Sequence, residues 1–329
     1  MNMQWLGRMS VLLSGLMLLA GEGRADSLQQ NFSGKASEEY VTNPLLIPAD
    51  QGLSAWRSTV DPNYMLTNVS GADQLTANLD MLLIHSSNTS IIADGGFPTA
   101  TLGWIRQSDK SKFDVTTSYS VASTMMAMPS TTGIVSANAT STTRNLSADW
   151  SRELSDRTTL TLNGAYTSMA FSGNGNSVSL YGFATQSSGV KLNYALNEHT
   201  ATFMNLSYVE FIPTGGGQSS RIYNALLGLD WNASERLDWI IQAGQSRLEE
   251  GTGNATSTTS LQGGMTMNYK GQLSSFTLSA NRQSTPSGLG AIILTEQVSG
   301  NLSYDLSERS NTGLDLGWSK YDALPVSFY

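Results

Sequence analysis

Few residues in this chain have the type and spacing that catalysis requires. The chain has two histidines and no cysteine, which excludes disulfides, thiolate metal sites and cysteine nucleophiles. His85 is followed by Ser86 and Ser87, and a histidine that activates a serine is the core of many hydrolases. Neighbouring strand residues point to opposite faces, so a polar residue at an interface is the simpler interpretation. We expect no catalytic residue and no enzyme activity.

Metal and cofactor sites are not indicated either. Met125, Met126 and Met128 lie in one predicted loop, where thioethers can bind a soft metal, but packing over apolar surface is the simpler role. The run Gly215–Gly217 lies between two predicted strands and is interpreted as a flexible loop. The sequence contains no zinc-protease motif and no phosphate-binding loop. We therefore predict no cofactor and no metal.

Four acidic residues lie on the polar side of segments whose polarity alternates. If these segments are strands, all four carboxylates face the polar side of a sheet. In a barrel that side is the lumen, where carboxylates favour cations or hydrogen-bond sugars. The alternative is that they pair with solvent or with lumen arginines. The acidic residues are Asp80, Asp230, Asp238 and Asp315, and the candidate arginines are Arg57, Arg106, Arg144 and Arg152.

Alternation of apolar and polar residues is the main structural signal. In residues 223–231, Tyr223, Leu227 and Trp231 share one side, and Asn224 and Asp230 share the other. This period predicts strands of the ~9–11 residues that cross a hydrocarbon layer. Single-chain bacterial barrels have an even number of strands, so we expect about 14–16. The predicted strands are 37–46, 55–69, 73–86, 97–107, 111–124, 141–154, 157–171, 177–196, 199–212, 220–232, 236–249, 256–270, 273–285, 291–306 and 309–321.

Short polar turns alternate with longer loops that are rich in Gly, Ser and Asn. Outer-membrane barrels place short turns in the periplasm and longer loops outside, which assigns the two ends. Seven of the eight prolines fall in or beside the longer loops, and only Pro62 lies inside a predicted strand, where we expect a bulge. The short turns lie near Gly71, Lys110, Ser155, Asn197, Ser234, Gly271 and Ser307.

An aromatic residue precedes several of the short turns by a few positions. Trp and Tyr gather at the membrane–water interface, so a ring of them at one rim predicts an aromatic girdle. The predicted girdle consists of Trp150, Tyr194, Trp231, Tyr269 and Tyr304.

Composition excludes most other classes. The net charge of -8 and the pI near 4.8 argue against a nucleic-acid partner. Only 13% of the residues are charged, about half the usual share. A sheet with one apolar and one polar face in lipid explains this mixture. After residue 25 no apolar run approaches the ~20 residues of a membrane helix, so a membrane crossing requires a closed sheet.

The first residues predict export. Arg8, the apolar stretch Met9–Ala20 and the small residues Gly23 and Ala25 are typical of a signal peptide over residues 1–25. We expect a short periplasmic segment over 26–36 and an outer-membrane barrel over 37–329. The last strand is expected to be irregular or missing, because Pro325 interrupts the alternation.

Three segments carry a family resemblance. They are Glu38–Pro44 with Trp56, Arg57 and Pro62; Arg282 with Ser284–Gly290; and the turn Leu306–Arg309. They resemble the outer-membrane β-barrel family found beside exosortase and exopolysaccharide gene systems, whose members usually continue into further strands where this chain ends. The resemblance implies an envelope role linked to polysaccharide production or export and names no catalytic residue.

We expect an outer-membrane pore or channel for small solutes or for exopolysaccharide export. A non-conducting structural or polysaccharide-binding barrel is the alternative, and a rim hydrolase that uses His85 has the least support. No plug domain is visible, so the lumen is open or is occluded by inward loops such as 123–139. The expected partners are outer-membrane lipid and lipopolysaccharide, the barrel-assembly machinery and exopolysaccharide.

Overall fold

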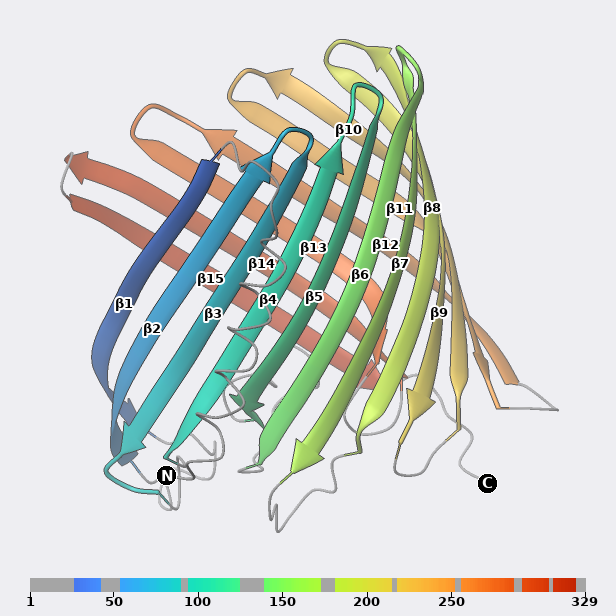
Figure 1. The fold of residues 1–329 in the computed structure, drawn as a ribbon. Helices are drawn as coiled ribbons and strands as arrows, with labels where there is room; N and C mark the ends of the chain where they lie inside the picture. The colour runs from blue at the N-terminus through green and yellow to red at the C-terminus, as the bar shows by residue number, and fades with distance from the viewer. Residues whose placement is uncertain are drawn as a thin grey trace.

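Fifteen antiparallel strands form one sheet in which each strand pairs with its neighbours in sequence (Figure 1). The computed structural model describes residues 27–42, 54–89, 94–124, 139–172, 181–214, 218–251, 256–286, 292–307 and 310–323. Within these ranges, no helix has the length and hydropathy of a membrane span. The strands are β1 (Ser27–Thr42), β2 (Ser54–Ser70), β3 (Asp73–Ser86), β4 (Gly95–Gln107), β5 (Ser111–Ser123), β6 (Thr140–Ser155), β7 (Thr158–Ser172), β8 (Phe183–Asn197), β9 (Thr200–Pro213), β10 (Ser220–Ser234), β11 (Leu237–Glu250), β12 (Thr256–Lys270), β13 (Ser274–Pro286), β14 (Ile292–Ser307) and β15 (Ser310–Ala323).

The all-β prediction is confirmed, and each predicted strand has a counterpart. Apart from β1 and β8, every strand begins and ends within two residues of its predicted bounds. The segment 27–36, which the sequence pattern places before the first strand, is instead the first part of β1 and pairs with β2. Apolar and polar residues scarcely alternate over 27–36, so the sequence pattern did not predict a strand there. Backbone pairing with β2 makes this segment a strand.

The short turns lie at one end of the sheet, the turn end, and the longer connections lie at the other, the loop end. Both β1 and β15 run from the turn end to the loop end, because Ser27 pairs with Val69 and Ser310 pairs with Ser307. In the described ranges each of these two edge strands pairs with a single neighbour. A direct ladder between them would therefore be parallel, unlike every other ladder of the sheet.

Cross-strand register assigns each residue to one of two faces. The apolar face carries Leu227, Leu229 and Trp231 of β10 and the residues paired with them, and many of its large side chains are exposed. Leu227 is 66% exposed. The polar face carries the alternate residues, such as Asn224 and Asp230. This alternation follows from the two-residue period of a strand.

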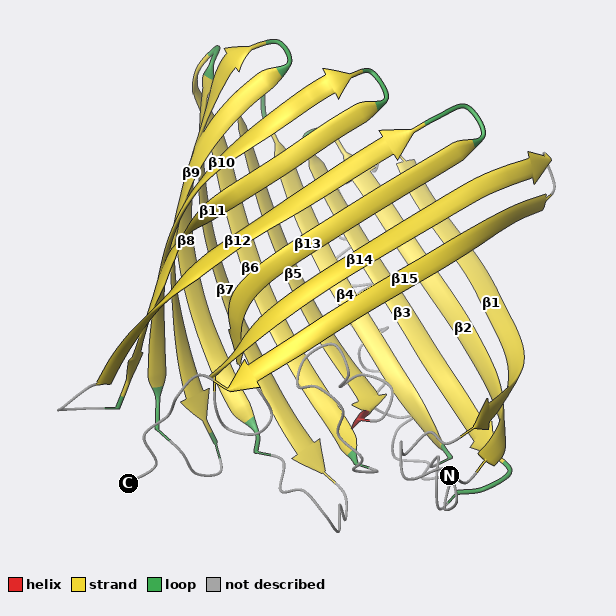
Figure 2. Cartoon of the chain, turned by 180° about the vertical axis from the view of Figure 1, so that it is seen from behind, coloured by secondary structure: helices red, strands yellow, loops and turns green. Residues whose placement is uncertain are grey.

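The polar face is the concave face of the curled sheet. Its residues Phe183, Phe211, Ile222 and Leu248 come from β8–β11 and form one buried cluster with Ile292 and Leu294 of β14. Strands β12 and β13 separate β11 from β14 in the sheet order, so this contact crosses the inside of the curve. Figure 2 shows the sheet from behind, with β14 and β15 crossing the side opposite β3–β5.

Four of the short turns share one sequence pattern and one geometry. The ladder shifts register beside Ser155, Asn197, Ser234 and Ser307, always at the second residue of the repeated Leu/Ala-Ser/Asn-Asp/Glu-Arg/His turn. At three of them the side chain accepts a hydrogen bond from the backbone N–H two residues later, at 2.8 Å for Asn197 and His199. Ser and Asn favour turns by making this local bond.

The bulge expected at Pro62 is not present. The β2–β3 ladder passes from Val60 paired with Leu83 to Asn63 paired with Asp80, so both strands advance equally across the interruption at Pro62. Proline lacks an N–H and interrupts a ladder without needing an extra residue.

The turn between β2 and β3 depends on a glycine at positive φ. Gly71 has a φ of 56° and room for a Cβ, and Gly317 also has room for one but no positive φ. We expect Gly71→Ala to lower the free energy of unfolding by about 1–2 kcal/mol, because a Cβ disfavours the left-handed region. Gly317→Ala is the matched control and should be neutral or slightly stabilising. Urea titration of the detergent-refolded protein measures both free energies of unfolding. An equal effect of the two substitutions would contradict the explanation that a Cβ strains the backbone at residue 71.

Candidate functional site

The four acidic residues singled out in the sequence lie on the polar face by register. Asp238 accepts a hydrogen bond from Asn268 at 2.8 Å, and Asp315 accepts one from Asn301. Asn63 donates to Asp80 at 3.5 Å and to Asn78 at 2.7 Å. Each of these three carboxylates thus accepts a hydrogen bond from a side-chain amide, and Asp80 also lies beside the carboxyl group of Asp61. Asp230 lies opposite Ala201 and Ile240.

Only one of the four candidate arginines faces the same side. Arg57 lies on the polar face and pairs with Glu39 of β1. Arg106, Arg144 and Arg152 lie on the apolar face, where their register partners include Phe113, Tyr119 and Leu160, respectively. Alternation within one strand does not reveal the facing of these arginines. The facing depends on whether the odd-numbered or the even-numbered residues of that strand point inward.

The end of the β13–β14 hairpin turns into the concave side of the sheet. We name residues 283–286 and 292–295 the β13–β14 arm. The β12–β13 ladder ends at Gly263 paired with Arg282, and in the described part of β12 residues 256–262 have no β13 partner. The arm continues its own ladder from Gln283–Thr295 to Pro286–Ile292. Figure 2 shows β13 curving away from β12 at this point.

The arm packs against the polar face of β8–β11. Ile292 and Leu294 belong to the apolar face by register, yet they are buried in the cluster with Phe183, Phe211 and Ile222. Ile292 and Phe211 are both 0% exposed. The side chains that would face outward in a continuous sheet thus cover the inner wall at the loop end. The unbroken apolar run Ala291–Leu294 is the sequence signal, because strands buried on both faces lose the alternation.

A similar departure occurs at β5 and β6. Toward the loop end, the last β4–β5 pair is Thr99 with Ser120. The preceding residue of β4 is Pro98, which has no N–H to donate to the ladder. Val121 packs against the polar-face cluster of Ala55, Ile84 and Phe97. Ser123, Thr124 and Ala139 are buried. Residues 125–138, with the methionines at 125, 126 and 128, lie outside the described residues, so the expected occlusion by the loop 123–139 stays a prediction.

The predicted aromatic girdle lies on the apolar face near the turn end. Tyr194, Trp231, Tyr269 and Tyr304 are exposed there, and Trp150 is half-buried opposite Leu162. A second aromatic row, which the sequence pattern alone did not indicate, lies near the loop end. It contains the ring pairs Tyr40–Trp56 and Tyr208–Tyr223, with centroids 5.1 and 5.3 Å apart.

The spacing of the two rows fits a hydrocarbon layer. Tyr223 and Trp231 of β10 belong to different rows and are separated by eight residues. A strand rises about 3.3 Å per residue, so the separation is about 26 Å along the strand. The apolar face between the rows is the part of the surface suited to contact with lipid chains.

His85 has a carboxylate partner but no serine partner. Its Nδ1 lies 2.8 Å from Asp94, whose other oxygen accepts a hydrogen bond from the Ser86 N–H at 2.6 Å. Both hydrogen bonds lower the pKa of Asp94 below its ordinary value, and the bond from the Ser86 N–H has the larger effect. The Ser86 hydroxyl donates to the Asn88 carbonyl, and the Ser87 hydroxyl accepts from the Trp56 N–H. The arrangement orients an exposed imidazole, and the hydroxyls of Ser86 and Ser87 are bonded to other groups.

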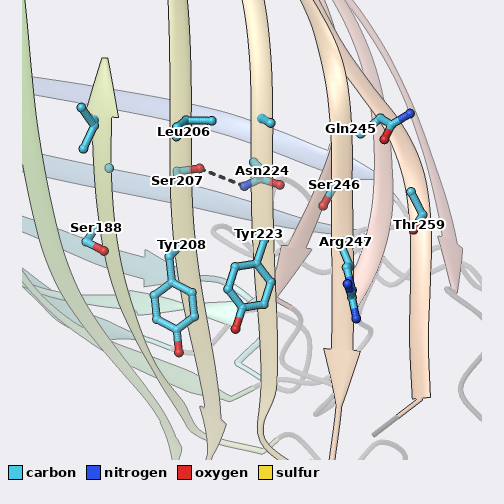
Figure 3. A pocket seen from close by; sticks show the side chains of 13 residues that line it. Ser188, Leu206, Ser207, Tyr208, Tyr223, Asn224, Gln245, Ser246, Arg247 and Thr259 are labelled. Carbon is cyan, nitrogen blue, oxygen red and sulfur yellow. Dashed lines mark hydrogen bonds between the residues drawn. The ribbon is translucent and has the colours of Figure 1, made fainter. Parts of the chain in front are cut away.

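A hollow lies on the apolar face over β8–β12 (Figure 3). Its volume is about 590 Å³, and it is lined by Val190, Leu206, Tyr208, Tyr223 and Arg247, among others. Its lining includes small residues such as Ser188 and Ala225. Elsewhere on the apolar face, positions such as 227 and 231 carry leucine and tryptophan. Within the described ranges, no group of three or more His, Cys, Asp or Glu residues is placed to hold a metal ion.

The fold is similar to that of solved outer-membrane transporters. The FrpB iron transporter from Neisseria meningitidis (F5-1 variant, apoprotein form) matches with a TM-score of 0.51 and 11% identity, over 93% of this chain and 55% of that chain. The siderophore receptor PiuA from Acinetobacter baumannii matches with a TM-score of 0.43 and 8% identity, over 89% and 62%. This chain therefore spans between half and two thirds of the length of these structures.

The class is thereby defined as an antiparallel sheet of the kind that forms outer-membrane β-barrels. At 11% identity the likeness to FrpB shows the fold alone. No protein-family model matches the chain, and no curated protein matches it either.

The burial of the arm is testable because the chain contains no cysteine. We expect the single cysteine of Leu294→Cys to react slowly with a water-soluble maleimide, whereas Leu306→Cys at the turn end, with Leu306 63% exposed, reacts fast. Adding Phe211→Ala should speed labelling at position 294 by at least about tenfold, because deletion of a buried ring costs ~3–5 kcal/mol of packing. Equal labelling at 294 and 306 in the parent background would show that the arm is not packed inside.

Proposed function

We propose that this protein is an outer-membrane β-barrel that passes solutes through a lumen lined by its polar face. The observation that carries this proposal is the two-faced sheet: large apolar side chains such as Leu227 and Trp231 are exposed on the convex face, and polar ones such as Asn224 and Asp238 lie on the concave face. Exposed apolar surface costs ~25 cal/mol per Å² in water, and contact with lipid chains removes that cost. Transport is supported further by the fold it shares with FrpB, whose name describes an iron transporter.

The remaining parts of the proposal follow from this placement. Residues 1–25 are removed on export, and the barrel-assembly machinery inserts the chain into the outer membrane. The turn end faces the periplasm and the loop end faces outward, as in other outer-membrane barrels. The protein is not an enzyme. Exopolysaccharide is one candidate solute, on the strength of the motif resemblance, and small hydrophilic solutes are the other.

The β13–β14 arm favours a gated pore over an open one. The β13–β14 arm covers the inner wall, while the edge of β12 over residues 256–262 lacks β13 partners. The Ser284, Thr285 and Thr295 hydroxyls are buried without a hydrogen-bond partner, and an unsatisfied buried group costs ~1–3 kcal/mol. Continuing the β12–β13 register would pair Gln262 with Gln283 and Leu261 with Ser284. In that outward position, the additional backbone hydrogen bonds between β12 and β13 offset the loss of apolar packing against the inner wall.

Conductance with a locked arm tests the pore. Gln262→Cys with Gln283→Cys should form a disulfide only when the arm joins β12, because a bridge needs Cα atoms ~4.4–6.8 Å apart. We expect the oxidised protein to give steady single-channel conductance in a planar bilayer, and reductant to return it to the rare openings of the parent. A disulfide between Thr266→Cys and Ser279→Cys, already paired in the ladder, is the control and should change nothing.

A folded, cross-linked protein without conductance would exclude the pore. The non-conducting barrel would then be the better function, with the β13–β14 arm packed on the inner wall and the outer loops as the binding surface. Saturable binding of polysaccharide to the refolded protein would support it.

Ion selectivity tests the role of the polar face. We expect Asp230→Asn combined with Asp238→Asn to lower the cation-to-anion permeability ratio, because carboxylates in a narrow aqueous pore concentrate cations. Asp73→Asn removes an acidic residue of the apolar face, opposite Arg106, and should leave the ratio unchanged. Reversal potentials in a salt gradient give the ratio. An equal change of the ratio in the two variants would show that Asp230 and Asp238 do not line the conduction path.

A further inference from the structure

The hollow on the apolar face combines small side chains such as Ser188 and Ala225 with charged side chains at its loop-end border. Register places Tyr208, Tyr223 and Arg247 side by side in one row across β9, β10 and β11. The next row toward the turn end consists of Leu206, Ala225 and Gln245. Figure 3 shows the two tyrosine rings and the Arg247 side chain extending toward the loop end from the strands that line the hollow.

The row beyond the tyrosines, toward the loop end, is charged. Arg221 lies opposite Glu210 on one side and Glu249 on the other. Its Nε is 3.6 Å from the Glu210 carboxylate, and the Arg247 Nη2 is 2.8 Å from the Glu249 carboxylate. Each glutamate thus engages one edge of a guanidinium. The Arg247 side chain is 60% exposed and the Arg221 side chain 49%, so both guanidiniums can be reached by a ligand at the surface.

We propose that this hollow binds a phosphorylated lipid of the outer leaflet, lipid A of lipopolysaccharide, with an acyl chain over the small residues and a phosphate on the two guanidiniums. The volume of about 590 Å³ lies within the range of small-molecule sites. Arginine presents a planar set of donors that matches phosphate, and tyrosine suits the border between apolar and polar layers. The glutamates hold the guanidiniums in a fixed orientation, which lowers the entropy lost on binding.

The position along the strands favours a membrane lipid over a free anion. The row Leu206–Ala225–Gln245 and the apolar face beyond it lie on the turn-end side, and the charged row lies on the loop-end side, in the order of acyl chain and headgroup. The hollow opens on the convex apolar face and not into the lumen. The proposal rests on the proposed outer-membrane placement of the chain, but it does not require that the lumen conducts.

Binding of lipid A to the detergent-refolded full chain, measured by native mass spectrometry, tests the site. We expect Arg221→Gln with Arg247→Gln to weaken binding of diphosphorylated lipid A by roughly tenfold or more, as expected when charged hydrogen bonds are lost. Fully dephosphorylated lipid A should bind the parent as weakly as the variant does. Arg152→Gln, at the turn end of the same face, is the matched control and should leave binding unchanged. Arg247→Lys keeps the charge and loses the planar donor set, so an intermediate loss is expected even if the double variant fails to fold.

Equal binding of phosphorylated and dephosphorylated lipid A by the parent would overturn the proposal, as would equal losses in the Arg152 control. Preferential retention of phosphatidylethanolamine over lipid A would assign the hollow to a different lipid and also contradict it. A protein without conductance that still binds lipid A through these arginines would reject the pore and keep this site.

Discussion

The antiparallel ladder between consecutive strands is the interaction on which the rest of this structure depends. Backbone N–H and C=O groups must be paired where water is absent, and a meander of neighbouring strands pairs them with the least loop length. Because each register is fixed across fourteen consecutive strand pairs, the two-residue period assigns every side chain to the convex or the concave side. The apolar belt, the two aromatic rows and the hydrophilic lumen are consequences of that single assignment.

The places where the ladder stops are as informative as the ladder itself. At Pro98 a missing donor ends the β4–β5 pairing, and beyond Arg282 the β13–β14 arm leaves β12. In both cases side chains that register assigns to the outside are buried against the inner wall. At both places, pairing with the neighbouring strand is exchanged for apolar packing. A balance between two such terms is what allows an element to adopt two positions.

The two faces of the sheet carry different kinds of polar contact. Inside, amides satisfy carboxylates through Asn268 with Asp238 and Asn301 with Asp315, leaving a hydrophilic wall with few ion pairs. Outside, Arg221 pairs with Glu210 at the loop end, beyond the tyrosine row, and Arg282 pairs with Glu296 on the same face.

The sequence by itself predicted about 14–16 strands, and the described residues form fifteen. It also determined nearly all strand bounds and the facing of Asp230 and Trp231, because these depend on local alternation and turn chemistry. It did not determine that residues 27–36 join β1, since their polarity scarcely alternates and only the ladder with β2 makes them a strand. Nor did it place Arg106, Arg144 and Arg152 outside, or bring Ile292 to Phe211 across the lumen. Those features depend on which residues of distant strands become neighbours, and the curl of the sheet decides that.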